Sequence, residues 1–537
     1  MSKKPRVQDI SKPGDEQLIN LDPNDLMKLP HPYDDNSEFP PLKPLKEAQK
    51  GRLEHALDGH VAIGIPKPQT EEEKRKYVEM FLSGLQKLLN KDDNWTFYQQ
   101  LMLTMENCTR CQTCSEACPV FVSSGRQEPY RPTYRAEVLR RIVKRYLTPG
   151  GKFFGKFTGA DIDLTWDAIA RLAELSYRCT ICRRCAQTCP IGVDNGLITH
   201  ELRKLFSQEM GIAAAELHRL GSVKHLETGS STGMTPAALM DTIEFMEEEV
   251  EEKTGMKFKW PVDKEGADIL LIHNAGEFLS WPENPEAFAI LFEKAGINYT
   301  LSSELVGYDG VNYGLWYDDV QFARVALKHL EVAKKLGVKK IVIGECGHAH
   351  KALTVIADRV MPEELNIPRE SCYVLFDEIV RSGKLSLDPR RNNFPVTLHD
   401  PCNIVRLMGI VEPQRRVLRK IAPRFREMTP HGVENYCCGG GSGFAIMQGL
   451  NFPDWRNGVS GRMKMKQILG AFEKELDSDE PKYICAPCSN CKGQLRGLLE
   501  YYNAGEKSNI RYTGLVELII NAMTDFEKPF LNPEEDF

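Results

Sequence analysis

The feature that most constrains this chain is a cysteine pattern that occurs twice. Residues 108–119 read CTRCQTCSEACP and residues 179–190 read CTICRRCAQTCP, so both follow the spacing C-x2-C-x2-C-x3-C-P. This is a ligand spacing of [4Fe–4S] clusters, in which three closely spaced thiolates bind one cluster and the cysteine before proline binds the other. Zinc sites commonly use two separated C-x2-C pairs, which leaves the third step and the Cys-Pro unexplained. The two runs therefore predict two cubane clusters rather than zinc.

The crossing of the fourth cysteine assigns four thiolates to each cluster. Between the runs, the stretch TYRAEVLRRIVKRYL places its apolar residues at helical spacing, and similar stretches flank the second run. We therefore expect an all-helical module that holds both clusters. The expected ligands are Cys108, Cys111, Cys114 and Cys189 for one cluster, and Cys179, Cys182, Cys185 and Cys118 for the other.

Composition narrows the cellular setting. The chain has 537 residues, 16 cysteines and a net charge of −6, which gives no support for nucleic-acid binding. Reduced thiols in a cytosolic chain usually serve metal or redox chemistry rather than disulfides. No window approaches the roughly 20 apolar residues that span a bilayer. The start MSKKPRVQDISKPGDEQ has no apolar segment, so we expect no secretory leader and a cytoplasmic protein that reaches the membrane only through a partner.

A second cysteine field lies between residues 346 and 491. The stretch FPVTLHDPCN, typical of a short strand, ends near Cys402, and KYICAPCSNC leads from another strand into three cysteines. Between these stretches, the adjacent Cys437 and Cys438 precede a glycine-rich loop. The carboxyl ends of parallel strands meet at one edge of a sheet, where the sites of α/β domains gather. We therefore expect an α/β domain whose thiols converge at that edge.

The segment before this domain resembles a degraded copy of it. GECGHAHKAL, residues 344–353, aligns without a gap with APCSNCKGQL, residues 486–495, and each follows an apolar strand. GYDGVNYG stands where the second copy has its adjacent thiols, so that Asp309 and Gly310 replace them. A repeat of this length indicates duplicated domains. Of the expected thiols, the first copy keeps only Cys346, which we interpret as a buried relic.

The same alignment bears on the choice of ligands in the second copy. Cys488 and Cys491 are favoured as a C-x2-C pair just before a helix N-terminus, where thiolates are stabilised, and Cys485 is the alternative. The aligned pairs are Cys346 with Cys488, Ala349 with Cys491, and Ile343 with Cys485.

These patterns predict a fold that combines α and α/β regions. The first copy is expected to be degenerate and the second intact. The predicted order is a Pro-rich N-terminal extension (1–94), the helical two-cluster ferredoxin module (95–215), linker helices (216–262), the degenerate α/β domain (263–385) and the intact α/β domain (386–537).

The pattern C…CCG…CxxC resembles the CCG signature of heterodisulfide reductase catalytic subunits. The order of parts, over about residues 95–525, is similar to the D-type catalytic chain of that family. The resemblance implies a noncubane [4Fe–4S] cluster, in which adjacent thiolates hold different irons and the glycines leave room for a substrate disulfide. The ligands that it implies are Cys402, Cys437, Cys438, Cys488 and Cys491.

The single intact copy and the N-terminal extension are most similar to the DsrK branch of this family, which works in the membrane complex DsrMKJOP. That resemblance implies electrons from a membrane cytochrome b subunit (DsrM-like), other complex subunits, and the trisulfide of a small DsrC-like protein as substrate. The competing hypothesis is an electron-relay subunit of a flavin-linked hydroxyacid or glycerol-3-phosphate dehydrogenase. The glycines after Cys438 do not form a G-x-G-x-x-G motif, and we find no flavin or nicotinamide signature.

Two further predictions concern individual residues. A proton donor for a leaving thiolate is expected among His399, Asp400, His348 and His350, which lie near predicted strand ends, although for each taken singly an ordinary buried or solvated polar residue is the more common explanation. GGKFFGKF, residues 150–157, nearly matches a phosphate-binding loop, but Phe157 replaces the hydroxyl residue that holds magnesium. We interpret this stretch as a loop between helices.

Overall fold

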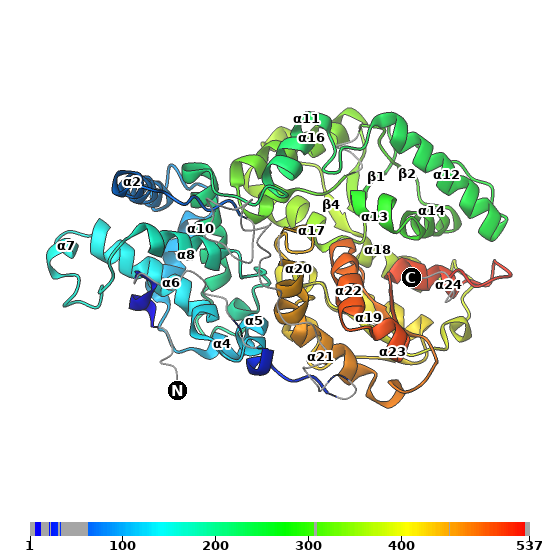
Figure 1. Cartoon of the computed structure of the whole chain (residues 1–537). Coiled ribbons are helices and arrows are strands. Elements are labelled where there is room, and N and C mark those ends of the chain that lie inside the picture. Colours follow the sequence, from blue (N-terminus) through cyan, green and yellow to red (C-terminus); the bar gives the residue numbers. More distant parts are fainter. Residues whose placement is uncertain are drawn as a thin grey trace. The chain divides into compact units, whose positions relative to one another are not determined.

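The computed structural model describes residues 6–11, 21, 23–30, 33, 63–304, 309–449 and 452–531. Most of the predicted N-terminal extension lies outside them. Within the described residues, no helix has the length and apolar character needed to cross a membrane. The chain forms two compact units (Figure 1). The first unit comprises Met1–His218, Trp316–Asp319 and Gly439–Lys464, and the second comprises Arg219–Leu315, Val320–Cys438 and Met465–Phe537.

The first unit is helical, and its described residues contain no strand. Its central helix is α10 (Asn195–Met210), most of whose residues are buried. Asp194 fixes the start of α10 by accepting hydrogen bonds from two backbone amides of its first turn. The helices that pack against α10 include α2 (Glu71–Leu88), α3 (Tyr98–Asn107), α6 (Pro132–Ile142) and α8 (Trp166–Ser176).

The second unit contains two parallel sheets that repeat one topology. The first sheet has the strand order β2-β1-β3-β4 and the second has β6-β5-β7-β8, so the same connectivity occurs twice. The predicted combination of α and α/β regions, with a duplicated α/β domain, is confirmed. The strands are β1 (Ile269–Ile272), β2 (Tyr299–Thr300), β3 (Lys340–Ile343), β4 (Arg369–Ser371), β5 (Val396–Leu398), β6 (Phe425–Arg426), β7 (Lys482–Cys485) and β8 (Ile510–Thr513).

Strand register extends the repeat to single residues. Ile272 pairs with Ile343 at the end of β1 and β3, and Leu398 pairs with Cys485 at the end of β5 and β7. His273 and His399 follow these pairs directly, so they occupy equivalent positions. Three residues further on, Gly276 is the counterpart of Cys402. The register therefore identifies Gly276 as the residue of the degenerate copy that stands in place of Cys402.

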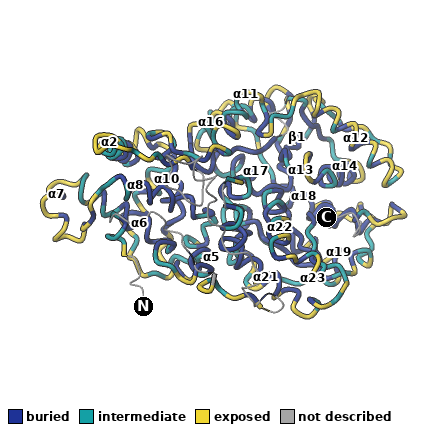
Figure 2. The backbone as a smooth tube through the Cα atoms, in the orientation of Figure 1, coloured by how far each residue is buried: buried dark blue, intermediate teal, exposed yellow. Residues whose placement is uncertain are grey.

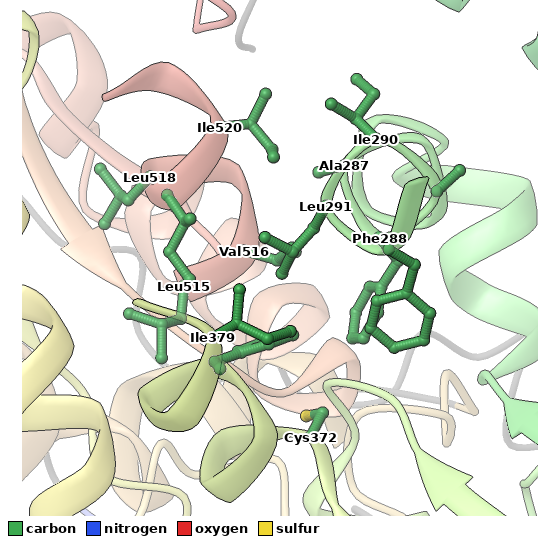
Figure 3. Close-up of a cluster of buried hydrophobic side chains, with 14 of the residues drawn as sticks. Ala287, Phe288, Ile290, Leu291, Cys372, Ile379, Leu515, Val516, Leu518 and Ile520 are labelled. Atoms are coloured by element: carbon green, nitrogen blue, oxygen red, sulfur yellow. The ribbon is translucent and has the colours of Figure 1, made fainter. Parts of the chain in front are cut away.

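The two copies share one hydrophobic core. Helix α14 (Glu283–Ala295) of the first copy packs against α24 (Leu515–Asn521) of the second. Figure 3 shows apolar side chains of both helices, with Cys372 and Ile379 of α18 (Cys372–Arg381), in this cluster. Strands β1, β5 and β7 are buried along their whole lengths. Each copy thus buries apolar surface that it could not cover alone, which stabilises the pair by about 25 cal/mol for each Å² buried.

Candidate metal centres

The first unit brings its eight motif cysteines together in two groups of four. One cavity is lined by Cys108, Cys111 and Cys114 of the first run together with Cys189 of the second. The other cavity is lined by three cysteines of the second run together with one of the first: Cys179, Cys182, Cys185 and Cys118. The structure therefore places the last cysteine of each run with the other run's first three.

The two runs also share an unusual backbone. Arg110 and Gln112 in the first run, and Ile181 and Arg183 in the second, have positive φ values of 58°, 68°, 48° and 59°. These residues occupy the same two positions after the first cysteine of each run. The left-handed conformation is costly for residues with a side chain. Its repetition at matched positions indicates that both runs wrap around the same kind of group.

The pKa values of the buried thiols indicate what kind of group the cavities can hold. Burial raises the pKa of Cys118 to about 12, and burial also raises the pKa of Cys114 to about 12. Metal ligands must be thiolates, so a cation has to offset this desolvation. All sixteen cysteines are free of disulfides. Four converging thiols in each cavity fit an iron–sulfur cluster in donor type and in number.

A third group of thiols lies at the carboxyl edge of the second sheet of the other unit. The sulfur atoms of Cys438 and Cys491 lie 3.6 Å apart. A ring nitrogen of His399 and these two sulfurs all lie within 4.8 Å of one another, and all three residues are buried. Cys437 is also buried, and Cys402 is half-buried at the end of the segment after β5. Of the two adjacent thiols, Cys438 thus reaches the same site as Cys491, which follows β7.

The degenerate copy contributes to this site through Cys488. The backbone amide of Gly347 donates a hydrogen bond to the Cys488 sulfur over 3.2 Å. A hydrogen bond from the Cys346 thiol, and a second from Cys491, hold the pKa of Cys488 well below its usual range. Asn274 donates to the Cys346 sulfur over 3.2 Å. Cys346 is therefore buried as expected, but it contacts a candidate ligand, a role that our interpretation as a relic missed.

Cys485, the alternative ligand, lies elsewhere. It is the last residue of β7 and belongs to the hydrophobic cluster shared by the two copies. Its backbone carbonyl accepts a hydrogen bond from the amide of His399 over 2.9 Å. The gapless alignment with the degenerate copy already placed Cys485 opposite Ile343, inside a strand. It therefore favoured a place for Cys485 in the sheet rather than in the ligand group.

Comparison with known proteins supports the assignment of both regions. The 4Fe-4S dicluster domain family matches residues 104–193, and the cysteine-rich domain (CCG) family matches residues 396–496. The chain is 28% identical to an Hdr-like menaquinol oxidoreductase iron-sulfur subunit 2 of Archaeoglobus fulgidus, over 94% of this chain and 97% of the relative. It is 22% identical to the D-type chain of the dihydromethanophenazine:CoB–CoM heterodisulfide reductase of Methanosarcina acetivorans, over 73% of this chain and 89% of the relative.

The chain contains a 4Fe-4S dicluster domain and a CCG domain, and it is similar over most of its length to heterodisulfide reductase-like iron–sulfur subunits. It is an iron–sulfur protein with an electron-transfer role, and an oxidoreductase. Similarity to a probable glycolate oxidase iron-sulfur subunit of Bacillus subtilis is restricted to 19% of each chain, at 28% identity. The heterodisulfide reductase-like subunits, in contrast, match most of this chain.

Three of the four candidate proton donors have different surroundings. His399 lies beside two thiols of the third group. Both carboxylate oxygens of Asp400 accept hydrogen bonds from Arg415, over 2.8 and 2.7 Å, in a fully buried ion pair. His348 Nε2 accepts a hydrogen bond from the amide of Asn312 over 3.0 Å, and burial lowers its pKa to about 3. Of the three, His399 is the side chain whose ring nitrogen lies within 4.8 Å of two candidate ligand sulfurs, those of Cys438 and Cys491.

The glycine-rich segment after the adjacent thiols packs inside the helical unit. Gly439 has a φ of 101°, and a Cβ there would meet the backbone of Gly461 at 2.6 Å. We expected these glycines to make room for substrate. At Gly439 the structure gives a different reason, which is close approach to another part of the chain.

A buried arginine fixes this segment in place. Arg203 of α10 donates to the carbonyl of Cys179 over 2.9 Å and to the hydroxyl of Ser442 over 2.6 Å. Its guanidinium also stacks on Tyr177, with 4.3 Å to the ring centroid. The first cysteine of the second run is thereby connected to a residue four positions after Cys438 in the chain. Neither partner is predictable from the sequence around Arg203.

Proposed function

We propose that this chain is the catalytic iron–sulfur subunit of a membrane-bound electron-transfer complex, and that it reduces a sulfur–sulfur bond. The observation that carries the proposal is the buried convergence of Cys438, Cys491 and His399 at the carboxyl edge of the second sheet. A cluster used only as a relay needs thiolates alone. A site that cleaves a disulfide also benefits from a group that gives a proton to the leaving thiolate.

Three clusters form the proposed cofactor set. The helical ferredoxin module (95–215) holds two [4Fe–4S] cubanes in its two cysteine-lined cavities. The intact domain (386–537) holds a noncubane [4Fe–4S] cluster through Cys402, Cys437, Cys438, Cys488 and Cys491, while the degenerate domain (263–385) supports it from Gly347. When bound, such clusters accept and release one electron at a time.

The proposed substrate is a disulfide or trisulfide of a small DsrC-like protein. Cleaving each sulfur–sulfur bond takes two electrons and two protons and leaves two thiols. A trisulfide has two such bonds, so it takes four electrons and four protons and yields two thiols and one hydrogen sulfide. In this scheme His399 gives a proton to the departing thiolate, and Asp400 holds the segment after β5 through Arg415. His348 is a less favoured proton donor because its ring accepts a backbone hydrogen bond.

The proposed electron source is a membrane cytochrome b subunit of the DsrM type, on the cytoplasmic face of the membrane. The full-length relative from Archaeoglobus fulgidus is named as a subunit of a menaquinol oxidoreductase, which supports a quinol as the upstream donor. A further relative, 21% identical over 76% of this chain, is an EtfAB:quinone oxidoreductase of Syntrophomonas wolfei. Both names refer to a quinol or a quinone, which supports a quinone-linked electron source for this chain.

A reductase assay under anaerobic conditions tests the proposal. The cluster-loaded protein, reduced with dithionite, is mixed with a DsrC-type trisulfide, and released hydrogen sulfide is measured. We expect turnover, and we expect His399→Gln to reduce the rate about 100-fold while the iron content stays unchanged. No turnover with a full set of clusters would refute the reductase proposal.

The second candidate is the electron-relay subunit of a flavin-linked hydroxyacid or glycerol-3-phosphate dehydrogenase. The similarity to the glycolate oxidase subunit supports it over 102 aligned residues. Under this alternative, a reduced flavin dehydrogenase would transfer electrons to the clusters, and a trisulfide would leave them reduced. Following cluster absorbance after adding each reagent separates the two functions.

A further inference from the structure

The stretch around residues 150–157 carries an exposed aromatic surface that electron transfer does not require. Phe157, Phe153 and Phe154 have exposed fractions of 88%, 81% and 66%. Among the described residues, these are the three most exposed large apolar side chains. Large aromatic side chains are normally buried, and a contiguous exposed group of them marks an interaction site.

The loop holds these side chains outward by a defined backbone. Helix α7 (Gly151–Phe154) is short, and the glycines at its two ends, Gly151 and Gly155, are buried while the residues around them are exposed. The carbonyl of Phe154 accepts from the amides of Phe157 and Thr158 over 3.0 and 3.1 Å. Figure 1 shows α7 projecting from the rest of its unit, and Figure 2 shows this loop as exposed. The phenylalanines are thus displayed by an ordered turn.

Basic side chains accompany the phenylalanines. Lys152 and Lys156 are exposed and alternate with them in the sequence GKFFGKF. Lys144 and Arg145 precede the loop, and no acidic residue occurs between residues 144 and 160. The next acidic residues, Asp161 and Asp163, are exposed at its far end. Since the whole chain has a net charge of −6, this local positive charge departs from the average of the protein.

We propose that this loop, defined by Phe153, Phe154, Phe157, Lys152 and Lys156, inserts into the surface of an anionic lipid bilayer. Interfacial membrane segments combine bulky apolar side chains, which enter the headgroup region, with lysines that attract anionic lipids. Protein interfaces are enriched in aromatic residues and Arg but depleted in Lys, so the lysines beside the phenylalanines fit an anionic lipid surface better than a protein groove. The loop would give the chain its own membrane contact, in addition to a membrane subunit, and this inference does not depend on the sulfur chemistry.

Vesicle flotation with the full-length, cluster-loaded protein tests this inference. We expect binding to phosphatidylcholine vesicles that contain phosphatidylglycerol, and weaker binding to phosphatidylcholine alone. The triple variant Phe153→Ser, Phe154→Ser and Phe157→Ser should bind at least tenfold more weakly. Each of Lys152→Gln and Lys156→Gln should weaken binding to the anionic vesicles about fivefold.

A matched control separates a local effect from a general loss of surface apolarity. Phe245 and Leu279 are also exposed, at 57% and 53%, and lie outside the loop. The double variant Phe245→Ser and Leu279→Ser should bind vesicles like the wild type, and all variants should retain their iron. Equal binding by the triple phenylalanine variant and the wild type would overturn the proposal. A second result would also overturn it: the wild type binds neither kind of vesicle, and the triple variant no longer co-purifies with a membrane subunit. The loop would then be a contact with another protein.

Discussion

The two copies of the α/β domain have the same strand order, but different kinds of residue lie at the carboxyl edge of their sheets. In the intact copy, Cys438, Cys491 and His399 converge there. In the degenerate copy, the counterpart of the adjacent thiols is Asp309–Gly310, and Asp309 accepts hydrogen bonds from the amide and hydroxyl of Ser231 over 2.8 and 2.7 Å. The edge of the intact copy therefore presents thiols, whereas the matching edge of the degenerate copy is closed by hydrogen bonds within the protein.

The degenerate copy, which has none of these converging thiols, has a structural role beside the intact copy. Around Glu345, the degenerate copy reaches into the intact one: its carboxylate accepts from the amide of Leu515 over 2.9 Å, and its carbonyl accepts from the amide of Ser489 over 2.8 Å. The neighbouring Gly347 amide donates to Cys488. The first copy has thus become a support for the helix that carries the ligands of the second.

Removing a thiol of the intact copy should have the largest effect. In Cys438→Ser we expect loss of about four irons from a total of about twelve, together with all sulfur-reducing activity, because the third cluster loses a ligand. Iron and sulfide analysis of the purified protein measures this. Cys372→Ser is the control, since this buried cysteine lies in the shared core and should leave the iron content unchanged. If Cys438→Ser keeps the iron content of the wild type, the intact copy does not hold a cluster through this thiol, and the proposed difference between the copies is contradicted.

Breaking the buried ion pair of the intact copy should come next. Arg415→Met leaves Asp400 without its cation, and we expect the free energy of unfolding to fall by about 3–5 kcal/mol. The counterpart of Asp400 in the degenerate copy is Asn274, a neutral helix cap. Asn274→Ala should cost only about 1 kcal/mol. Urea unfolding followed by circular dichroism compares the two, and equal losses would contradict the proposed difference in electrostatics.

Enlarging a residue at the closed edge should have an intermediate effect. In Gly310→Ala, the new Cβ would lie 2.9 Å from the carbonyl oxygen of His273 and 3.0 Å from the Cβ of Ala349. We expect a loss of about 1–3 kcal/mol of unfolding free energy, because the site has no space. The same urea experiment measures it. An unchanged unfolding midpoint would show that the degenerate edge is open after all.

The smallest expected effect is a pH dependence confined to the degenerate copy. Burial lowers the pKa of His350 to about 4, below the value of about 6.5 in an unfolded chain. The unfolded state therefore binds more protons between these values, so the stabilisation is complete above pH 6.5 and is lost as the pH falls toward 4. His350→Gln should reduce this acid sensitivity by about 1–2 kcal/mol.

The control for this prediction is His431→Gln, because His431 is exposed in the second copy. Its stability profile between pH 4 and pH 7 should follow that of the wild type, measured by urea unfolding at each pH. The aligned position of His350 in the intact copy is Lys492, which forms a buried ion pair with Glu517. If His350→Gln loses as much unfolding free energy at low pH as the wild type does, the acid sensitivity does not come from His350.

Local patterns in the sequence were enough for the fold class and for the duplicated domain. Helical spacing around the two cysteine runs predicted the helical module, and the gapless alignment of residues 344–353 with 486–495 predicted that Cys346 and Cys488 occupy equivalent positions. Both are properties of short segments, whose backbone geometry follows from their own residues. The alignment did not predict that these two residues touch, because contact between copies depends on how the shared core packs.

By itself, the sequence predicted the candidate ligand residues and their spacing, and it determined the order of the helical and α/β parts. Only the tertiary structure decided that His399 lies beside the thiols while Asp400 is held in an ion pair, that Arg203 connects Cys179 to Ser442, and that three phenylalanines stay exposed. The physical reason is distance along the chain. Hydrogen-bond partners and solvent exposure are set by residues tens or hundreds of positions away, which no local spacing encodes.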